Sequence, residues 1–463
     1  MQFRNHHFGT VRFATRNSNN TFNNMKFYNR ESEIARLSDI QQRSLQSAQM
    51  TVVTGRRRIG KTQLLLKATE STPTLYFFVA RKAESFLCQD FQQEIAEKLG
   101  EPVLGASTSF SKLFEYIMKL STKKSFNLII DEFQEFFNVA PSVYSDMQHY
   151  WDIYKDQSNL NLMVSGSINS LMYKIFQNAK EPLFGRATAM MRLLPFSTTV
   201  LKEILYDYNK NYTPDDLLAL YTFTGGVAKY VQLLMDNGAT TLETMLDYIV
   251  NEDSTFINEG KNILIEEFGK EYAVYFSILS CIARGENTRS KIEAVVNREI
   301  GGYLTKLEQD YGLISKNTPI FSKVETKNVR YVLEDNFLSF WFRFIYKYSY
   351  IIEIGGYNQL KSIISRDYST FSGKMLERYF KTKFIEQNKF TRLGGYWDRK
   401  GENEIDLLAI DEINNEAEII EIKRNADNIS INALKSKFGA FEKATGELKG
   451  FEIQILGLSM KDM

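Results

Sequence analysis

A glycine-rich segment early in the chain has the residue types and the spacing of a phosphate-binding loop. The apolar run 51–53 leads into the pattern G-x-x-x-x-G-K-T over residues 55–62, and a helical run begins at Gln63. The glycines let the backbone curl until successive N–H groups face one phosphate pair at the positive end of a helix. Lys61 can then reach the β- and γ-phosphates, and the Thr62 hydroxyl can complete a Mg²⁺ shell. A chance glycine loop is the alternative, but the complete pattern with both flanks favours a nucleoside triphosphate with Mg²⁺ as the ligand.

A pair of carboxylates lies where a second part of such a site is expected. Asp131 and Glu132 follow an apolar run that starts at Phe126, about seventy residues beyond the glycine-rich segment. Buried strands of a parallel sheet read as continuous apolar runs, and ligands bind at their carboxyl ends. Asp131 could therefore hold the Mg²⁺ shell, while Glu132 could orient and deprotonate an attacking water.

Two further features could complete this site. The next apolar run, from Leu160, ends in Ser165 and Ser167. Either hydroxyl could contact the γ-phosphate or the water, and a plain strand-terminating turn is an equal alternative. Arg186 follows a glycine in the segment P-L-F-G-R. Such an arginine can neutralise transition-state charge within its own subunit or in a neighbouring one, and spacing does not exclude a surface arginine.

The C-terminal part of the chain holds a second set of chemically suited residues. A helical run carries Glu377 among apolar positions, and two later apolar strands carry Asp406 and the pair Glu421 and Lys423. Period-2 alternation puts Glu421 and Lys423 on one face of their strand. The carboxylates could hold Mg²⁺ for phosphodiester cleavage, and the lysine could steer charge at the attacked phosphorus. Surface charges on strands are the alternative, because E-x-K is common in isolation.

The composition is that of an ordinary soluble protein. The 463 residues, 43% hydrophobic and 24% charged, allow two to four domains. The 57 basic and 56 acidic residues nearly cancel, so no global field attracts nucleic acid or membrane. Cys88 and Cys281 lie far apart, and no apolar run reaches the roughly 20 residues of a membrane span, so we expect a cytoplasmic protein without disulfides.

Residues 1–24 are basic and acid-poor, which suggests a disordered leader, or a misassigned start with Met25 as the true initiator.

The elements predicted to position these residues fall into four segments. Strands and helices alternate over 25–205, as expected of a P-loop core, and 206–265 reads as a helical lid over the nucleotide. In 266–335 three helices precede a strand pair, which is the winged-helix order. The ten basic and nine acidic residues of 270–335 favour a structural or protein-contacting role over a DNA-reading face. Residues 336–463 form the last predicted domain.

Five motifs together resemble those of a known ATPase group. Residues 25–260 contain, in this order, G-R-R-R-I-G-K-T, L-I-I-D-E, S-G-S, P-L-F-G-R and T-G-G-V-A-K-Y. This series is similar to that of the archaeal and bacterial ATPases of the AAA+/STAND group, whose relatives include origin-recognition-like ATPases. The resemblance implies an ATP site made of Lys61, Thr62, Asp131 and Glu132, with Arg186 as a conditional member.

Two positions depart from the pattern of that group. Residues 29–33, N-R-E-S-E, resemble the G-R-E-x-E box that closes over the adenine, with Asn29 in place of glycine. A helix capped by Asn29 explains the same letters equally well. Ala228 stands where the lid of the group usually has proline, which puts the geometry of the lid in question.

The tail has a resemblance of its own. E-I-D-L-L followed by E-I-I-E-I-K is similar to the PD-(D/E)XK nuclease superfamily, and the whole tail resembles a domain of unknown function that is often fused to this ATPase family. The match implies a nuclease quartet of Glu377, Asp406, Glu421 and Lys423.

The sequence therefore predicts an α/β protein with a parallel-sheet P-loop ATPase core, a helical lid, a winged helix and a restriction-endonuclease-like C-terminal domain. The predicted function is ATP hydrolysis coupled to a metal-dependent nuclease-like domain; the alternative is an ATP-dependent switch with an inert tail. Candidate partners besides ATP and Mg²⁺ are DNA or another nucleic acid, a protein bound through the winged helix and further copies of the chain, with no membrane association. The candidate nucleotide-binding residues are Gly55, Arg58, Gly60, Lys61, Thr62, Gln63, Asp131 and Ser165. The candidate catalytic residues are Glu132, Arg186 and Lys423, and the candidate metal ligands are Thr62, Asp131, Glu377, Asp406 and Glu421.

Overall fold

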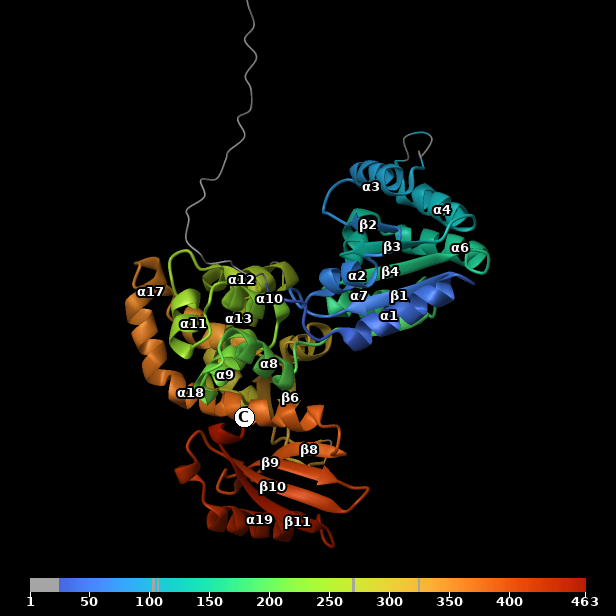
Figure 1. The fold of residues 1–463 in the computed structure, drawn as a ribbon. Coiled ribbons are helices and arrows are strands. Elements are labelled where there is room, and N and C mark those ends of the chain that lie inside the picture. The colour runs from blue at the N-terminus through green and yellow to red at the C-terminus, as the bar shows by residue number, and fades with distance from the viewer. Residues whose placement is uncertain (1–24, 102–104, 106–107, 269–270, 324) are drawn as a thin grey trace, which may run out of the picture.

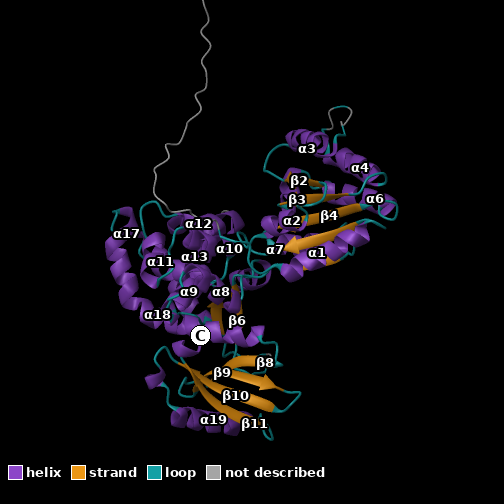
Figure 2. Cartoon of the chain, in the orientation of Figure 1, coloured by secondary structure: helices purple, strands orange, loops and turns teal. Residues whose placement is uncertain are grey.

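The chain forms three bodies in a computed structural model, which describes residues 25–101, 105, 108–268, 271–323 and 325–463. The expected leader lies outside these residues. Figure 1 shows an N-terminal body built on one sheet, a central helical body, and a C-terminal body built on a second sheet. Figure 2 shows that the central body consists almost entirely of helices. Of the helices in the described ranges, none combines the length and the apolarity that crossing a membrane requires.

The first sheet has five parallel strands in the order β2-β3-β4-β1-β5. Every position of β3 and β4 is buried. This explains their continuous apolar sequences, because a parallel sheet is covered by helices on both faces. The strands are β1 (Gln49–Thr54), β2 (Thr74–Phe78), β3 (Phe126–Asp131), β4 (Leu160–Gly166) and β5 (Ala189–Arg192).

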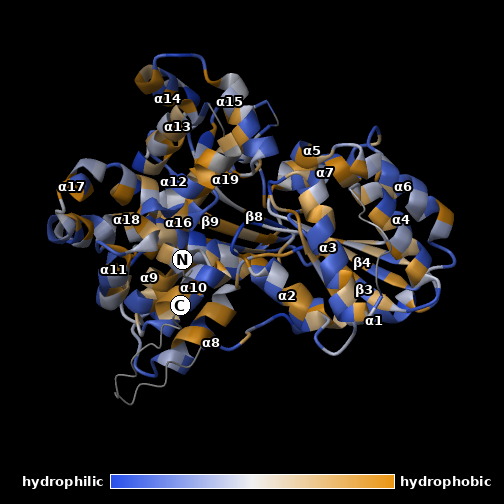
Figure 3. Ribbon diagram, turned by 90° about the horizontal axis from the view of Figure 1, so that it is seen from above, coloured by the Kyte–Doolittle hydropathy of each residue, from blue (hydrophilic) through white to orange (hydrophobic). Residues whose placement is uncertain are grey.

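Helices cover this sheet on two sides. They are α1 (Glu31–Ser44), α2 (Lys61–Ala68), α3 (Glu84–Leu99), α4 (Phe110–Ser121), α5 (Phe136–Val139), α6 (Val143–Tyr154) and α7 (Asn169–Gln177). Along β3, Leu128 and Ile130 pack into one core with α3, α4 and α6, while Ile129 packs on the other side with Leu64 of α2. Figure 3 shows hydrophobic and hydrophilic stretches alternating along helices such as α2 and α3, as expected where one side of a helix is buried.

The central body is arranged around α9, which is buried from Asp216 to Thr224. A reciprocal capping box between Thr213 and Asp216 begins this helix, with Pro214 at its first turn. Three helices and an antiparallel strand pair follow the lid helices, in the order that the winged-helix prediction requires. The elements up to this point are α8 (Thr198–Tyr208), α9 (Pro214–Thr224), α10 (Ala228–Asp236), α11 (Leu242–Ile249), α12 (Thr255–Phe268), α13 (Tyr272–Arg284), α14 (Arg289–Val296), α15 (Gly301–Thr305), β6 (Ile314–Asn317) and β7 (Arg330–Leu333).

The central body extends past residue 336, where the sequence led us to expect the last domain to begin. Here α16 (Asn336–Phe340), α17 (Ser349–Glu353) and α18 (Tyr357–Glu386) follow, and both α16 and α18 pack against α9. Phe340 lies against Phe223 of α9 with ring centroids 4.7 Å apart, and Tyr379 of α18 lies against Tyr221. The aromatic stripe after residue 336 is thus a packing surface between elements.

The C-terminal body is a four-stranded sheet in the order β11-β10-β9-β8, with α18 and α19 (Ile431–Thr445) on its two faces. β9 pairs antiparallel with both β8 and β10, and β11 runs parallel to β10. The strands are β8 (Arg392–Trp397), β9 (Glu404–Asp411), β10 (Glu416–Ile422) and β11 (Glu452–Leu458). The predicted fold class, an α/β protein with a parallel core sheet and a separate C-terminal sheet domain, is confirmed.

Candidate functional site

The glycine-rich loop between β1 and α2 needs glycine at both ends. Gly55 has φ 151°, and a Cβ there would lie 2.8 Å from the carbonyl oxygen of Leu193. Gly60 has φ 95°, in the left-handed region that side chains rarely adopt. The Lys61 ammonium, at the start of α2, donates to the carbonyl oxygens of Gly55 at 2.9 Å and Arg56 at 3.1 Å. It therefore lies inside the curve of the loop, where a phosphate-binding lysine is required.

Asp131 is the most heavily hydrogen-bonded carboxylate of this region. Its Oδ2 accepts from the Thr62 hydroxyl at 2.6 Å and from the Tyr76 hydroxyl at 2.9 Å. Its Oδ1 accepts from the Ser165 hydroxyl at 2.5 Å and from the backbone N–H of Glu132 at 3.0 Å. The structure thus brings together Thr62 and Asp131, the two residues expected to hold Mg²⁺, and their oxygen atoms are the donors that this ion prefers.

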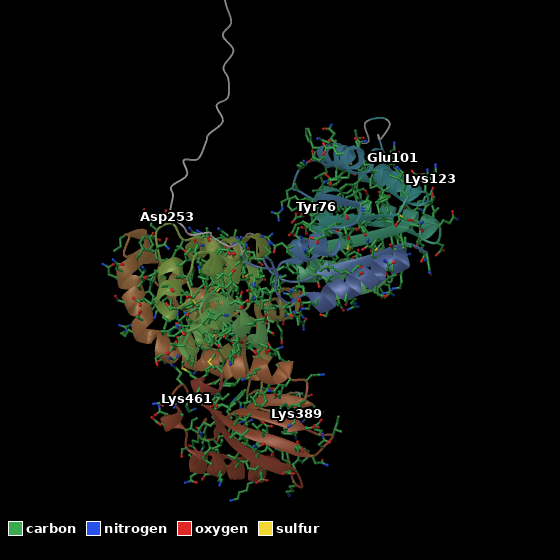
Figure 4. The ribbon with its side chains drawn as sticks, viewed as in Figure 1. Tyr76, Glu101, Lys123, Asp253, Lys389 and Lys461 are labelled. Atoms are coloured by element: carbon green, nitrogen blue, oxygen red, sulfur yellow. The ribbon has the colours of Figure 1, made fainter. Side chains whose placement is uncertain are left out.

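Tyr76 was not foreseen as a site residue. It comes from β2 and lies in the N-terminal body, where Figure 4 labels it. Burial and the neighbouring Asp131 raise the pKa of its hydroxyl, so it stays protonated and donates to the carboxylate. A tyrosine in an apolar strand carries no chemical signal in a sequence, since tyrosine is common in strands for packing alone.

Glu132 sits beside this carboxylate in a conformation that side chains seldom adopt, with φ 53°. Non-glycine residues with a positive φ of this kind are enriched at functional sites. Its Oε2 accepts a hydrogen bond from the Ser167 hydroxyl at 2.8 Å and another from the side-chain amide of Gln134. The two serines that the sequence left as alternatives therefore hold different carboxylates, Ser165 that of Asp131 and Ser167 that of Glu132.

The loop also contacts the central body through arginines. Arg58, with φ 67°, pairs at 2.8 Å with Glu259 of α12, and Arg56 pairs with Asp335. Both acids are about 2% exposed. Burial raises the pKa of the Glu259 carboxyl, and a hydrogen bond from Tyr230 and the charge of Arg58 partly offset this rise. Arg58, expected to bind nucleotide, is thus tied to the central body.

One expectation about the edge of the site needs correction. Asn29 does not cap α1: the N-cap is Arg30, and Asn29 lies one residue earlier with φ 45°. Such a φ suits the glycine that Asn29 replaces in the G-R-E-x-E box. The Arg30 guanidinium donates to the carbonyl oxygen of Leu194 at 2.8 Å and lies over the ring of Phe196, so it joins α1 to the segment before α8. Gln63 is an exposed residue of α2, and its role in binding nucleotide stays a prediction.

Arg186 is not brought to this cluster. It pairs with Asp152 at 2.8 Å and donates to the carbonyl oxygens of Pro182 and Phe184. Thr188 then bonds to Met50 at the start of β1, and β5 runs parallel to β1 from there. Arg186 therefore lies at the amino end of the strands, whereas the glycine-rich loop follows their carboxyl end. A role within its own subunit is not supported, and a role in a neighbouring subunit stays a prediction.

The tail brings its predicted residues together around a lysine. The Lys423 ammonium lies 3.0 Å from Asp406 Oδ2 and 3.7 Å from Glu421 Oε1. Asp406 Oδ2 also accepts from the backbone N–H of Ile422 at 2.8 Å. Ile419 of β10 pairs with Leu408 of β9 in an antiparallel ladder. When this register is continued by two residues, Glu421 lies opposite Asp406. The two acids therefore share one face of the sheet.

Glu377 approaches this group from α18. Burial and the nearby charge of Asp406 raise the pKa of its carboxyl to about 7, and Lys423 opposes the rise. The same carboxylates keep the pKa of Lys423 above its ordinary value, against its own burial. A carboxyl that titrates near neutrality beside a charged lysine is a common feature of functional sites.

One residue of the tail cluster was missed. Lys437 of α19 pairs with Glu421 Oε1 at 3.2 Å, and the backbone N–H of Ser430 donates to Oε2 at 3.2 Å. Within the described part of the chain, no three His, Cys, Asp or Glu side chains are grouped as a metal site. Asp406 and Glu421 offer hard oxygen donors that suit Mg²⁺, and Lys423 lies between them.

Fold and site together define the class of this protein as a P-loop ATPase with an additional C-terminal sheet domain. Residues 27–234 match an ATPase domain found predominantly in Archaea. Residues 341–434 match a domain of archaeal and bacterial proteins of unknown function. The resemblance drawn from the motifs, an ATPase of this family followed by a domain of unknown function, is thereby confirmed.

Several known proteins are similar to this chain. An uncharacterised protein of Methanocaldococcus jannaschii is 28% identical over 407 residues, which cover 86% of this chain and 87% of that protein. The solved Walker-type ATPase of Pyrococcus abyssi is 18% identical with a TM-score of 0.52, and the match covers 68% of this chain and 96% of that one. It supports the fold. The ORC2 protein of Aeropyrum pernix, solved as ADPNP and ADP complexes, is 12% identical over 70% of this chain and 94% of its own, with a TM-score of 0.45.

Proposed function

We propose that this protein binds ATP with Mg²⁺ and hydrolyses it, and that its tail cleaves nucleic-acid phosphodiesters under the control of the bound nucleotide. The first part rests on one observation: Asp131 holds the Thr62 hydroxyl at 2.6 Å, immediately beside Lys61. That is the donor set on which P-loop ATPases bind the Mg²⁺ of Mg-ATP.

Each residue of the nucleotide site then has a role. The Lys61 ammonium neutralises the β- and γ-phosphates, while Thr62 and Asp131 hold the ion in place. Mg²⁺, when bound, neutralises charge that develops on the phosphate oxygens. Glu132 takes the proton of the attacking water, and its hydrogen bond from Ser167 fixes the direction of the carboxylate.

The nuclease half of the proposal is supported by the grouping of Glu377, Asp406, Glu421 and Lys423 at one end of the tail sheet. Asp406 and Glu421 would hold a divalent ion, which supplies a more acidic water and stabilises the leaving oxygen. Lys423 keeps its proton and can neutralise the attacked phosphate. The order α18–β8–β9–β10–α19–β11, with β11 parallel to β10, is also the order expected of a restriction-endonuclease-like domain.

The test is cleavage by the full-length protein. Supercoiled plasmid, single-stranded and branched DNA, and RNA are incubated with Mg²⁺ or Mn²⁺, with and without ATP. We expect cutting that EDTA blocks, that ATP alters in rate, and that Asp406→Ala removes while ATP hydrolysis continues. Absence of cutting of every substrate, or cutting that survives in Asp406→Ala, would overturn the nuclease assignment.

A second candidate function is an ATP-dependent switch with a catalytically inert tail. One observation favours it: both oxygens of Glu421 already accept hydrogen bonds, from Lys437 and from the Ser430 backbone. These bonds would make the cluster a structural ion network. A wild-type protein that hydrolyses ATP, cuts nothing, and is destabilised by Glu421→Gln would support this reading.

A further inference from the structure

A basic pocket lies where the β6–β7 loop meets the turn after β8. Its volume is about 650 Å³, and its lining consists of Ser322, Lys323, Glu325, Thr326, Lys327 and Arg399. The first five come from the loop between β6 and β7, and Arg399 comes from the turn between β8 and β9. Two elements that are about seventy residues apart in sequence thus form one concave surface.

The β6–β7 loop is held firmly against the tail sheet. The backbone N–H of Ile320 donates to the carbonyl oxygen of Gly395 at 2.8 Å, and the Trp397 indole donates to the side-chain oxygen of Asn328 at 3.0 Å. Arg330 stacks on the Trp397 ring at 4.4 Å and pairs with Glu404 at 2.7 Å. These contacts flank the pocket residues on both sides, so the lysines of the loop are presented from a fixed scaffold.

The charges of the pocket are unbalanced. Lys323, Lys327 and Arg399 face a single carboxylate, Glu325, in the lining. Elsewhere many basic side chains form ion pairs, but across the described ranges these three have no carboxylate within ion-pair distance. All three are exposed. Exposed cations that are grouped in a concave surface without internal partners attract anions.

Glu404 of β9 connects the surroundings of the pocket with the carboxylate cluster of the tail. Glu404, which pairs with Arg330 beside the pocket, also contributes to the raised pKa of Glu377. Asp406 follows Glu404 by two residues on β9, about 7 Å along an extended strand. That distance corresponds to roughly two phosphates at about 3.4 Å per nucleotide of a duplex strand. A backbone that passes Glu404 therefore needs about two nucleotides to reach the level of Asp406.

We propose that the β6–β7 loop and the β8–β9 turn form the surface that binds the phosphate backbone of a nucleic acid, with Lys323, Lys327 and Arg399 as its contacts. The inference rests on the proposed nuclease function and names the substrate-binding surface of that site. A nucleic acid fits better than an acidic protein because the adjoining group of acids and lysine suits phosphodiester chemistry. Contacts of this kind position a strand without reading its sequence.

The test measures binding separately from cleavage. Fluorescein-labelled 20-nucleotide single strands and 20-base-pair duplexes are titrated with full-length protein in EDTA, and anisotropy is read at several salt concentrations. We expect the double charge reversal Lys323→Glu and Lys327→Glu to weaken binding at least tenfold. The slope of log affinity against log salt should become shallower by roughly 1.4 for the single strand and roughly 1.8 for the duplex, since two phosphate contacts are lost.

A matched control carries the same change of charge elsewhere in the tail. Lys443→Glu and Lys449→Glu lie on α19 and in the turn before β11, outside the lining of the pocket, and both lysines are exposed. We expect this variant to bind like the wild type, and both variants to keep the wild-type melting temperature. Equal weakening in both variants, or none in either, overturns the proposal.

The outcomes also separate this surface from the nuclease assignment. If the loop variant loses binding and the wild-type protein cuts nothing, the binding surface is supported and the nuclease assignment is refuted. If the wild-type protein cuts and the loop variant binds with normal affinity, the binding surface is refuted and the nuclease assignment is supported. A wild-type protein that binds labelled polyglutamate but no oligonucleotide rejects a nucleic acid as the occupant.

Discussion

Asp131 and Glu132 are neighbours in the chain, yet their surroundings give them different tasks. Asp131 accepts four hydrogen bonds and is 4% exposed, so its carboxylate is fixed as a ligand that cannot turn towards a water. Among the described residues, Ser167 and Gln134 donate to the same oxygen of Glu132, which leaves its other oxygen available to accept a proton. In the tail, Asp406 and Glu377 also have different surroundings. Asp406 pairs with Lys423, whereas the pKa of the Glu377 carboxyl is raised to about 7.

The division of roles at the nucleotide site predicts two separable defects. Glu132→Gln should keep ATP affinity and lower turnover by about 10²–10⁴-fold, because only the base is removed. Lys61→Ala should instead abolish tight binding, because the charge that meets the phosphates is lost. Equilibrium binding of a fluorescent ATP analogue and steady-state phosphate release measure the two quantities. Near-normal hydrolysis by Glu132→Gln would refute this assignment.

The raised pKa of Glu377 predicts how stability changes with pH. Between an ordinary pKa near 4.5 and the folded value of about 7, the unfolded state has lost a proton that the folded state still holds. Stability from this group is therefore lost as pH rises through that window, by roughly 1–3 kcal/mol at pH 8. Glu377→Gln, which never ionises, should melt like the wild type at pH 4.5 and at a higher temperature at pH 8, in EDTA. A difference in melting temperature that is constant across this range would contradict the prediction.

At the scale of elements, the loop between β1 and α2 is held by the central body as well as by its own sheet. Arg56 and Arg58 reach Asp335 before α16 and Glu259 on α12, and the backbone N–H of Lys229 donates to the carbonyl oxygen of Arg58 at 3.1 Å. Ala228, which stands where the resembling group usually has proline, begins α10. It lies close to Gly60, because a Cβ added at Gly60 would be 3.8 Å from the Cβ of Ala228. The lid therefore meets the nucleotide loop directly.

The pair of Arg56 and Asp335 should show this coupling as a double-mutant effect. Arg56→Ala leaves a carboxylate that is 2% exposed without its cation, at a cost of about 2–3 kcal/mol, moderated because the arginine itself is a third exposed. Asp335→Asn keeps the oxygen that caps α16 at Leu338 and removes the charge. The double variant should be more stable than the sum of the single effects predicts, by about 0.5–3 kcal/mol, as measured by chemical denaturation. Strict additivity would show that the two charges do not interact.

At the scale of the whole molecule, the tail is joined to the lid next to its candidate catalytic lysine. Arg424 follows Lys423 and donates to Asp215, in the first turn of α9, at 2.5 Å and to Ser372 of α18 at 2.6 Å. One continuous hydrophobic core includes Val53 of β1, α9, α18 and Ile422 of β10. We therefore expect a movement of the predicted lid to reach the tail through packed elements rather than through a flexible linker.

This connection predicts a variant that separates the two activities. Arg424→Ala should retain ATP hydrolysis and metal-dependent cleavage, and should lose the change in cleavage rate that ATP produces, because the link to Asp215 is cut. Lys389→Ala is a suitable control: this lysine, labelled in Figure 4, pairs with acids of the tail sheet itself. Cleavage by Arg424→Ala that still responds fully to ATP would show that coupling takes another route.

The sequence by itself determined those features whose signal is contiguous. The phosphate-binding loop, the apolar strands that end in Asp131 and Ser165, and the helices of the lid are written in short runs, because a strand end or a helix turn is fixed by neighbouring residues. The same holds for the two apolar strands that carry Asp406 and Glu421, and for the alternation that puts Glu421 and Lys423 on one face.

Only the tertiary structure decided what depends on contacts between distant segments. The approach of Tyr76 to Asp131, the pairing of Arg56 with Asp335 and the contact of Lys437 with Glu421 join residues that no local pattern relates. Arg186 shows the converse, because its glycine turn suggested chemistry while the parallel pairing of β5 with β1 placed it at the other end of the sheet. The position of a side chain along a strand is a local property, but the end of the sheet at which it lies depends on how the strands are paired.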